Sequence, residues 1–148
     1  MRTIIRKRMI FQEAVDLSGG TLKVIFQKTF KDEVFEKFHI ENIYFKDCTF
    51  EDCTFTGCNF HEVDCIDTNF ENCKIEMMGR YVGFARVDFY QCDLSFRLDN
   101  SYLDKTSFTR TKFTKMELDN SSIKNTQLYQ EGGKAVRLIK CSMENSSL

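Results

Sequence analysis

The chain has 148 residues, and its 21 lysines and arginines against 22 aspartates and glutamates give a net charge of −1. This length corresponds to about one domain, and the balanced charge excludes a global electrostatic attraction to nucleic acids or anionic membranes. With 42% apolar and 29% charged residues, disorder is not expected over most of the chain. The apolar runs are only a few residues long, so we expect no membrane-spanning helix. The basic start, Met1–Arg8, lacks the apolar stretch of a signal peptide.

Residues 1–34 are predicted to form an N-terminal cap. Two stretches, Ile4–Phe11 and Thr21–Phe30, have the composition of β-strands, and Ser18-Gly19-Gly20 between them favours a hairpin. Val15-Asp16-Leu17 also looks like one isolated unit of the pattern that follows. The boundary between cap and pattern therefore stays open at this point.

Residues 35–130 carry an apolar residue at every fifth position, which we call a centre. The series runs unbroken from Ile40 to Ile75, resumes at Phe84, slips by one after Leu94 and continues from Leu98 to Leu128. A period of five fits neither an α-helix nor a flat strand, so the chain must turn inward once every five residues. The predicted core centres include Phe45, Phe50, Phe55, Phe60, Phe70, Phe84, Phe89, Leu94, Leu103, Phe108 and Phe113.

The residue two places before each centre, which we call the flank residue, is mostly small. It is a cysteine at Cys48, Cys53, Cys58, Cys73 and Cys92, and mostly serine or threonine after Leu98. The other three positions of each unit are mostly polar. Two inward positions per five residues, one small and one large, indicate a filled interior.

Units such as Cys48-Thr49-Phe50-Glu51-Asp52 and Cys58-Asn59-Phe60-His61-Glu62 resemble the motif of the pentapeptide-repeat family, approximately Ala-Asp/Asn-Leu-x-x. Cys92-Asp93-Leu94 fits the same motif, and the resemblance covers about residues 38–130. It implies an all-β fold, a right-handed quadrilateral β-helix in which four pentapeptides make one square coil. The repeat region then forms a solenoid of nearly five coils.

The four-sided coil makes the slips in the series interpretable. Residues about twenty apart would share a side, so Phe50, Phe70, Phe89 and Phe108 would stack. The slips then correspond to two four-residue units, Ile75–Gly79 and Leu94–Leu98, that lie on one side, one coil apart. Stacked deletions let neighbouring coils keep pairing. Gly79 remains a weak point, because it supplies no central side chain.

Residues 131–148 are predicted to be a C-terminal cap or a dimerisation segment. Gly132-Gly133 interrupts the pattern, and Lys134–Met143 is typical of a short helix or strand closing this end. An open coil end offers unpaired strands and apolar side chains, which makes a homodimer through this end a reasonable expectation.

The cysteines and histidines favour structural roles. Spacings of five between Cys48, Cys53 and Cys58 do not match zinc motifs, and a chain without a secretory signal is expected to keep its thiols reduced. His61 lies on an outward position beside Glu62, with no second histidine placed near it. We therefore predict no catalytic residue, cofactor or metal, and we expect Cys141, outside the repeat, to be the most exposed thiol.

Charge is distributed unevenly along the repeat. Acidic residues dominate from Glu41 to Cys73, and four basic residues without an acid follow from Lys105 to Met116. This favours a polarised docking surface for a protein. Its candidate residues are Asp47, Glu51, Asp52, Glu62, Asp64, Asp67, Glu71, Lys105, Arg110, Lys112 and Lys115.

Three functions are compatible with these features. The first is a non-enzymatic interaction module that binds a protein partner, with no direct contact to nucleic acid or membrane. The second follows from the resemblance, because some family members imitate duplex DNA and bind DNA gyrase, although the near-neutral charge and the basic stretch count against it. The third is a bacterial effector delivered into host cells. The resemblance suggests a bacterial, cytoplasmic protein.

Overall fold

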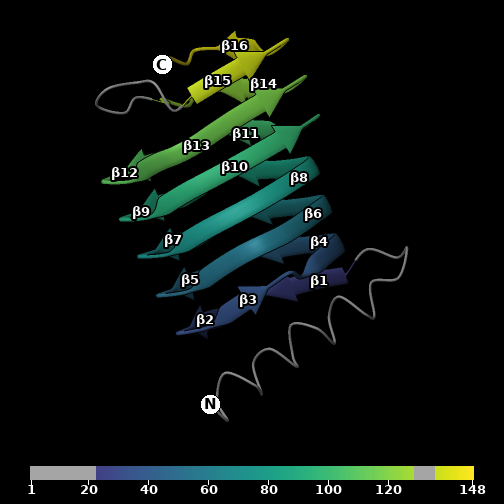
Figure 1. Ribbon diagram of the computed structural model, residues 1–148, viewed down its shortest axis with the longest axis vertical. Coiled ribbons are helices and arrows are strands. Elements are labelled where there is room, and N and C mark those ends of the chain that lie inside the picture. Colours follow the sequence, from purple (N-terminus) through teal and green to yellow (C-terminus); the bar gives the residue numbers. More distant parts are fainter. Residues whose placement is uncertain (1–22, 129–135) are drawn as a thin grey trace.

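Parallel strands stacked along one axis make up the residues that the computed structural model describes, 23–128 and 136–148 (Figure 1). No described segment forms a helix, and thus none could cross a bilayer as one. In chain order the strands are β1 (Lys23–Phe26), β2 (Thr29–Lys31), β3 (Val34–Glu36), β4 (His39–Lys46), β5 (Thr49–Glu51), β6 (Thr54–Ile66), β7 (Asn69–Glu71), β8 (Lys74–Ala85), β9 (Asp88–Tyr90), β10 (Asp93–Asp99), β11 (Tyr102–Asp104), β12 (Ser107–Thr109), β13 (Lys112–Asp119), β14 (Ser122–Lys124), β15 (Val136–Ile139) and β16 (Ser142–Glu144).

The strands build a solenoid of about six turns with four sides per turn. The first side contains β1, β11, β14, β16 and the ends of β4, β6 and β8. The second is the five-stranded sheet β2-β5-β7-β9-β12. The third contains β3 and the starts of β6, β8, β10 and β13. The fourth contains β15, the start of β4, the middle of β6 and β8, and the ends of β10 and β13.

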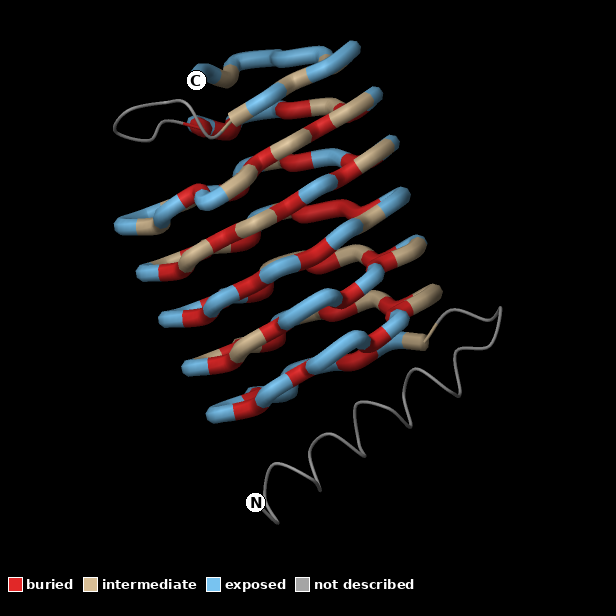
Figure 2. The backbone as a smooth tube through the Cα atoms, viewed as in Figure 1, coloured by how far each residue is buried: buried red, intermediate tan, exposed pale blue. Residues whose placement is uncertain are grey.

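Buried residues recur along each coil, as Figure 2 shows by the regular red segments. The predicted core centres are all buried except Phe108, which is half-buried. On the second side the rings of Phe30, Phe50, Phe70, Phe89 and Phe108 stack in one line, with neighbouring centroids 4.8–5.2 Å apart and nearly parallel planes. The predicted stack of phenylalanines is therefore present, and Phe30 extends it by one coil.

The turns between sides depend on the residue two places after each centre, which we call the corner residue. Nineteen non-glycine residues in the described chain have positive φ, and they lie at such corners, for example Asp47 with φ 53° and Asp67 with φ 50°. Asparagine and aspartate adopt this left-handed conformation at lower cost than most residues. Lys105 and Arg110 adopt it too, so the fold imposes it even where the residue type does not favour it.

The two shortened units lie where they were predicted, on neighbouring coils of the same sides. Ile75 pairs with Leu94, Met77 with Phe96 and Gly79 with Leu98, without a register shift. Register shifts occur only against the flanking coils, between Phe55 and Cys58 and between Leu94 and Ser95. No corner residue with positive φ stands in either unit, so the chain rounds this corner as continuous strand in β8 and β10.

Gly79 does not leave a void in the coil. A Cβ built on Gly79 would lie 2.7 Å from Val82 Cγ2 and 2.8 Å from Leu98 Cδ2. These two buried side chains occupy the space that a central side chain would fill. The neighbouring coil thus compensates for the missing centre.

The solenoid begins earlier than the predicted boundary at residue 35. Lys23–Phe26 pairs in parallel with Ile43–Lys46, and Thr29–Lys31 with Thr49–Glu51, so the stretch up to Phe30 belongs to the first coil rather than to a hairpin. Parallel pairing is incompatible with a tight two-stranded hairpin, which requires antiparallel neighbours. The proposed partner strand, Ile4–Phe11, lies outside the described residues.

At the other end, β15 and β16 continue the same coil geometry as the last described turn. Val136 pairs with Met116, and Ser142 pairs with Ser122, both in parallel. Of the two structures predicted for Lys134–Met143, the strand is the one seen in the described residues. The Gly132-Gly133 segment lies outside them.

Candidate interaction surface

Most flank side chains with a hydroxyl or thiol bind the backbone of the column. The Sγ atom of Cys73 lies 3.3 Å from the carbonyl oxygens of both Phe50 and Glu71, to which its thiol donates. Thr106 does the same with its hydroxyl, at 3.1 Å from Phe84 O and 3.2 Å from Asp104 O. Each such group connects its own coil to the preceding one. Cysteine, serine and threonine can therefore replace one another at this position, because each combines a small side chain with one donor.

Burial makes several thiols of the column poor nucleophiles. Removal from water raises the pKa of the thiols of Cys48, Cys58 and Cys65. Contact with the sulfur atoms of Cys53 and Cys92, together with burial, raises the pKa of the Cys73 thiol. Because the thiolate is the reactive and metal-binding form, these residues are suited to packing rather than to chemistry.

Cys141 occupies a flank position of the last coil, contrary to the prediction that it lies outside the repeat. Its Sγ lies 3.2 Å from Leu118 O and 3.3 Å from Ile139 O, as in the earlier coils. It is half-buried, whereas the other six cysteines are buried. It is therefore the most exposed thiol for a different reason from the one proposed: the final coil has no further coil above it in the described chain.

The two histidines are not brought together in a metal site. His61 packs edge-to-face on Tyr81, with ring centroids 5.7 Å apart, and its Nε2 lies 3.7 Å from Glu62. His39 contacts Glu41, with Nε2 3.4 Å from the carboxylate. Within residues 23–128 and 136–148, no three potential ligands come close enough to hold a metal ion.

The predicted docking residues are distributed around the column rather than on one side of it. Asp47, Asp67 and Lys105 lie at the corner between the first and second sides, and Asp52 and Arg110 at the next corner. Glu51 and Glu71 lie on the second side, Asp64 on the first, Lys112 on the third, Glu62 at the corner before the first side, and Lys115 between the third and fourth. The acids belong to earlier coils than the bases, so the polarity runs along the axis.

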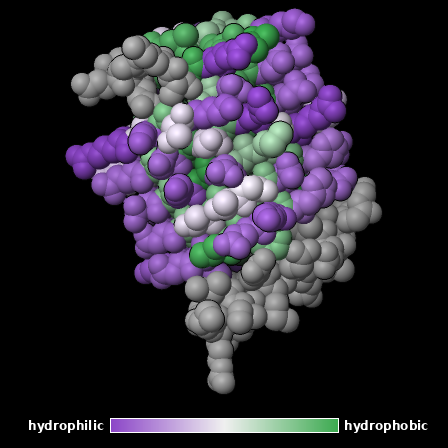
Figure 3. All heavy atoms as spheres, in the orientation of Figure 1, coloured by the Kyte–Doolittle hydropathy of each residue, from purple (hydrophilic) through white to green (hydrophobic). Residues whose placement is uncertain are grey.

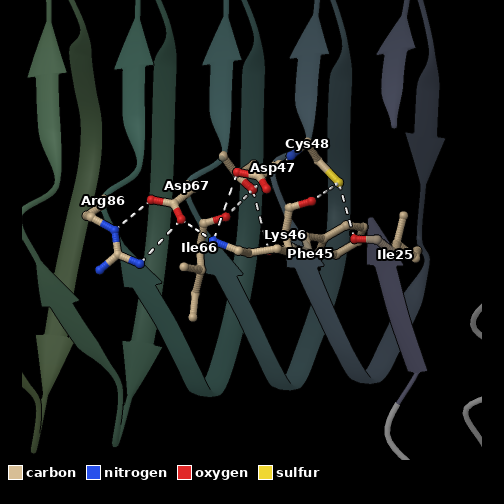
Figure 4. A network of polar contacts seen from close by, with 9 residues as sticks. Ile25, Phe45, Lys46, Asp47, Cys48, Ile66, Asp67 and Arg86 are labelled. Atoms are coloured by element: carbon tan, nitrogen blue, oxygen red, sulfur yellow. Dashed lines mark hydrogen bonds and ion pairs between the residues drawn. The ribbon is translucent and has the colours of Figure 1, made fainter. Parts of the chain in front are cut away.

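Asp67 is the hub of a charged network at the first corner (Figure 4). It accepts a hydrogen bond from Lys46 and another from Arg86 Nε at 2.6 Å, so three neighbouring coils are connected. The adjacent Arg86 guanidinium, with Lys46, lowers the pKa of the Asp67 carboxyl to about 2. The network also holds two long basic side chains in defined positions.

A second contact on the first side spans three coils. Tyr102 donates a hydrogen bond of 3.1 Å to Asp64 Oδ1, two coils away, across Gly83 in the coil between them. A Cβ at Gly83 would lie 2.2 Å from the Tyr102 ring, so only glycine lets the ring lie flat on the backbone. Burial, with the charge of Asp64, raises the pKa of the Tyr102 hydroxyl to about 12.

The third and fourth sides carry shallow hollows rather than an enclosed chamber of clustered titratable groups. One hollow of about 240 Å³ lies over the shortened units and is bordered by Gly57, Glu76, Met77 and Ser95. In the view of Figure 3, hydrophilic side chains line both edges of this face, and hydrophilic, neutral and hydrophobic side chains are mixed in its middle. The outward chemistry is therefore that of a mixed contact surface with polar edges.

The four-sided coils, parallel ladders and filled interior define a β-solenoid. Residues 41–76 match the family model for pentapeptide repeats, with eight copies. A comparison with curated protein sequences finds no relative.

Solved structures with some similarity include a trypsin-treated variant of QnrB1, described as a plasmid-mediated fluoroquinolone resistance protein. It has 11% identity and a TM-score of 0.33, with 84% of this chain and 83% of that chain covered. Another is described as a putative glycosyl hydrolase from Parabacteroides merdae, with 8% identity and a TM-score of 0.35 over 94% of this chain and 88% of that chain. The fold assignment rests on the strand pairing of this chain itself.

Proposed function

We propose that this protein is a non-enzymatic module that binds a protein partner through its second side. The observation that carries the proposal is the pair of stacked acids Glu51 and Glu71, which are register partners on β5 and β7. Neither forms an ion pair within the described part of the chain, and exposed Asp52 lies beside them. Unpaired acids on a flat, rigid side are suited to a partner that presents lysine or arginine.

The filled interior supports a role without catalysis. The flank thiols and hydroxyls are hydrogen-bonded to backbone carbonyls, so they are not poised to attack a substrate. The groups that remain available point outward from a rigid frame. Recognition of a macromolecule needs such a surface and does not need a deep pocket.

Imitation of duplex DNA is the second candidate, supported by the acidic early coils. Duplex DNA carries uniform negative charge along its length. Here Asp67 is neutralised by Lys46 and Arg86, and the later coils present Lys105 and Arg110. We therefore expect no effect of the protein on DNA supercoiling by gyrase, with or without a quinolone. Protection of gyrase would favour this candidate over the first.

The proposal is tested by neutralising the acids of the second side. A chain carrying both Glu51→Gln and Glu71→Gln is compared with the unchanged chain in affinity capture from cells of the native source, with quantitative mass spectrometry. A chain with Glu117→Gln is the matched control, because Glu117 already pairs with Arg97 at 3.1 Å on the fourth side. We expect the control to retain the captured partner and the double variant to lose it. Equal capture by all three chains would contradict the proposal.

A further inference from the structure

The first side carries a pattern that is complementary to itself when its order of coils is reversed. Four successive coils, centred on Phe45, Cys65, Phe84 and Leu103, present three outward columns each. Before the centres stand Tyr44, Asp64, Gly83 and Tyr102; after them stand Lys46, Ile66, Ala85 and Asp104; at the corner stand Asp47, Asp67, Arg86 and Lys105.

From this pattern we infer that two copies of the chain associate side by side and antiparallel through their first sides. A twofold axis parallel to the strands, lying between the coils of Cys65 and Phe84, superimposes each column on the same column of a second copy in reverse order. Interfaces of this kind are self-complementary, because each contact occurs twice.

In the column after the centres and in the corner column, every charged residue then faces a residue of opposite charge on the second copy. Lys46 faces Asp104 of the second copy, and Asp47 faces Lys105 of the second copy. Asp67, which already holds Arg86 of its own chain at 2.6 Å, faces the second Arg86 as well. The four groups at the axis thus alternate in sign.

The uncharged positions agree with this arrangement. Ile66 faces Ala85, and Tyr44 faces Tyr102, so apolar surface meets apolar surface near the axis. The second side has less of this feature: under the same operation Glu51 would face Thr109 and Glu71 would face Tyr90, with no base opposite either acid, and Asp52 facing Arg110 would be its one pair of opposite charges in these coils. The complementarity is therefore more complete on the first side.

The groups involved are accessible and already held in place. The side chains of Asp47 and Arg86 are 41% and 55% exposed, and Tyr102 is 38% exposed. Lys46 and Arg86 are positioned by Asp67, and the Tyr102 ring is held over Gly83 by Asp64. Prior ordering lowers the entropic cost of association.

The size of the surface predicts a weak dimer. Along the axis, a side measures four to five coils spaced about 4.8 Å apart, and across it measures four residues of about 3.3 Å each. The area of one side is therefore on the order of 300 Å². Two such sides bury less than the roughly 1,200 Å² typical of stable complexes. Self-association should therefore be measured at tens to hundreds of micromolar, and it should weaken as salt is added.

Charge reversal at Asp47 and Lys105 provides the test. These residues lie three coils apart in one chain, so they meet only between copies. Both have positive φ, and each residue type already occupies this corner column, so the Asp47→Lys and Lys105→Asp variants should keep the fold. In sedimentation velocity, we expect the unchanged full-length chain to dimerise and each variant alone to dimerise about tenfold more weakly.

An equimolar mixture of the two variants should restore association to near the unchanged level. In the mixed pair, both symmetry-related contacts join opposite charges again, whereas each variant alone joins two lysines or two aspartates twice. Asp52→Lys and Arg110→Asp, at the next corner, are the matched controls and should not change association.

Four results would overturn the inference. Three of these are a monomeric unchanged chain at about 1 mM, a mixture that associates no better than its separate variants, and a dimer that withstands both reversals but is lost when residues 136–148 are removed. The last result would assign the dimer to the C-terminal end. Loss of the dimer in the Asp52→Lys and Arg110→Asp controls would place the contact on the second or third side, and would likewise overturn it.

Discussion

The middle of the second side and the final coil both carry an apolar centre in each unit, but these centres are buried to different extents. Phe70 and Phe89 have a stacked ring above and below them and are 4% and 0% exposed. In the final coil Leu138 is half-buried, and the centre of β16, Met143, is 40% exposed. The local sequence rule is the same in both places. What differs is the number of neighbouring coils.

This difference shows that the unit of stability is a pair of coils rather than a coil. In the middle of the column each centre is covered by a coil on either side, as expected for solenoids with nearest-neighbour energetics. The final coil of the described chain has one such neighbour, so its side chains are only partly removed from water. A homodimer through this end stays a prediction, since nothing described here tests it.

The largest expected effect is the loss of a ring from the middle of the stack. Phe89→Ala should lower the free energy of unfolding by about 3–5 kcal/mol, because a ring enclosed on all sides leaves a cavity. Leu138→Ala in the final coil should cost about 1 kcal/mol, since its site is already partly hydrated. Urea unfolding monitored by circular dichroism measures both. Equal costs would show that the final coil is as well packed as the middle.

The same comparison predicts a difference in thiol chemistry. Cys73 should react with a thiol reagent on the order of a hundredfold more slowly than Cys141 in the native protein, because reaction requires an opening that costs free energy. After denaturation both should react alike. Labelling followed by peptide mass spectrometry gives the order of reaction. Fast native labelling of Cys53, Cys73 and Cys92 would mean that the interior of the column is open to solvent.

A smaller effect, which changes sign with context, is expected at Gly83. Gly83→Ala should destabilise by about 1 kcal/mol, because the new methyl group displaces the Tyr102 ring and breaks its hydrogen bond to Asp64. In a chain that already carries Tyr102→Ala, the same change should be neutral or stabilising by about 0.5 kcal/mol, as is usual for glycine in a strand. A double-mutant cycle with no coupling would contradict the contact.

The smallest effect is expected on the outer surface. Glu71→Ala should change the free energy of unfolding by less than about 0.5 kcal/mol, because this exposed carboxylate has no ion-pair partner in the described chain. Thermal unfolding alongside Phe89→Ala provides the comparison. A cost as large as that of Phe89→Ala would mean that the inward register is wrong.

The repeat could be predicted from the sequence because its inward positions leave little freedom. A large apolar residue at each centre and a small residue at each flank repeat often enough to define the register, and the two slips indicate which coils are shortened. Turns were not predicted in the same detail. Their signal, the frequent aspartate, asparagine or glycine two places after the centre, as at Asp47, Asp67 and Gly57, was present in the sequence.

The coils at both ends were not predicted as part of the repeat, because their sequences follow the five-residue pattern less closely. Ile25, Phe30 and Phe35 follow the period of five in phase with Ile40, but their flank residues are Lys23, Lys28 and Glu33. In the first described coil only the large centre is present as a signal, so half of the pattern that defines the register is missing there. Leu138 likewise lies two periods after Leu128, although Gly132-Gly133 interrupts the series between them.

The arrangement of the surface could be predicted only in part. The sequence indicates that acids precede bases, but placing Asp64, Gly83 and Tyr102 in one column depends on the shortened coils, which change the spacing from twenty to nineteen residues. The contact of Tyr102 across Gly83 follows from side-chain direction, which no spacing rule supplies. Polar contacts between the side chains of different coils are therefore harder to predict from the sequence than the inward packing positions.

The corner between the third and fourth sides has a consequence for how such chains vary in length. A residue is absent there in two successive coils, and the strands on either side of the corner keep their partners. Insertions and deletions of one residue can accumulate at this corner without altering the number of coils or the alignment of the other three corners. Homologous chains of different length should therefore differ here first, and an alignment that places gaps elsewhere would mismatch the sides of the column.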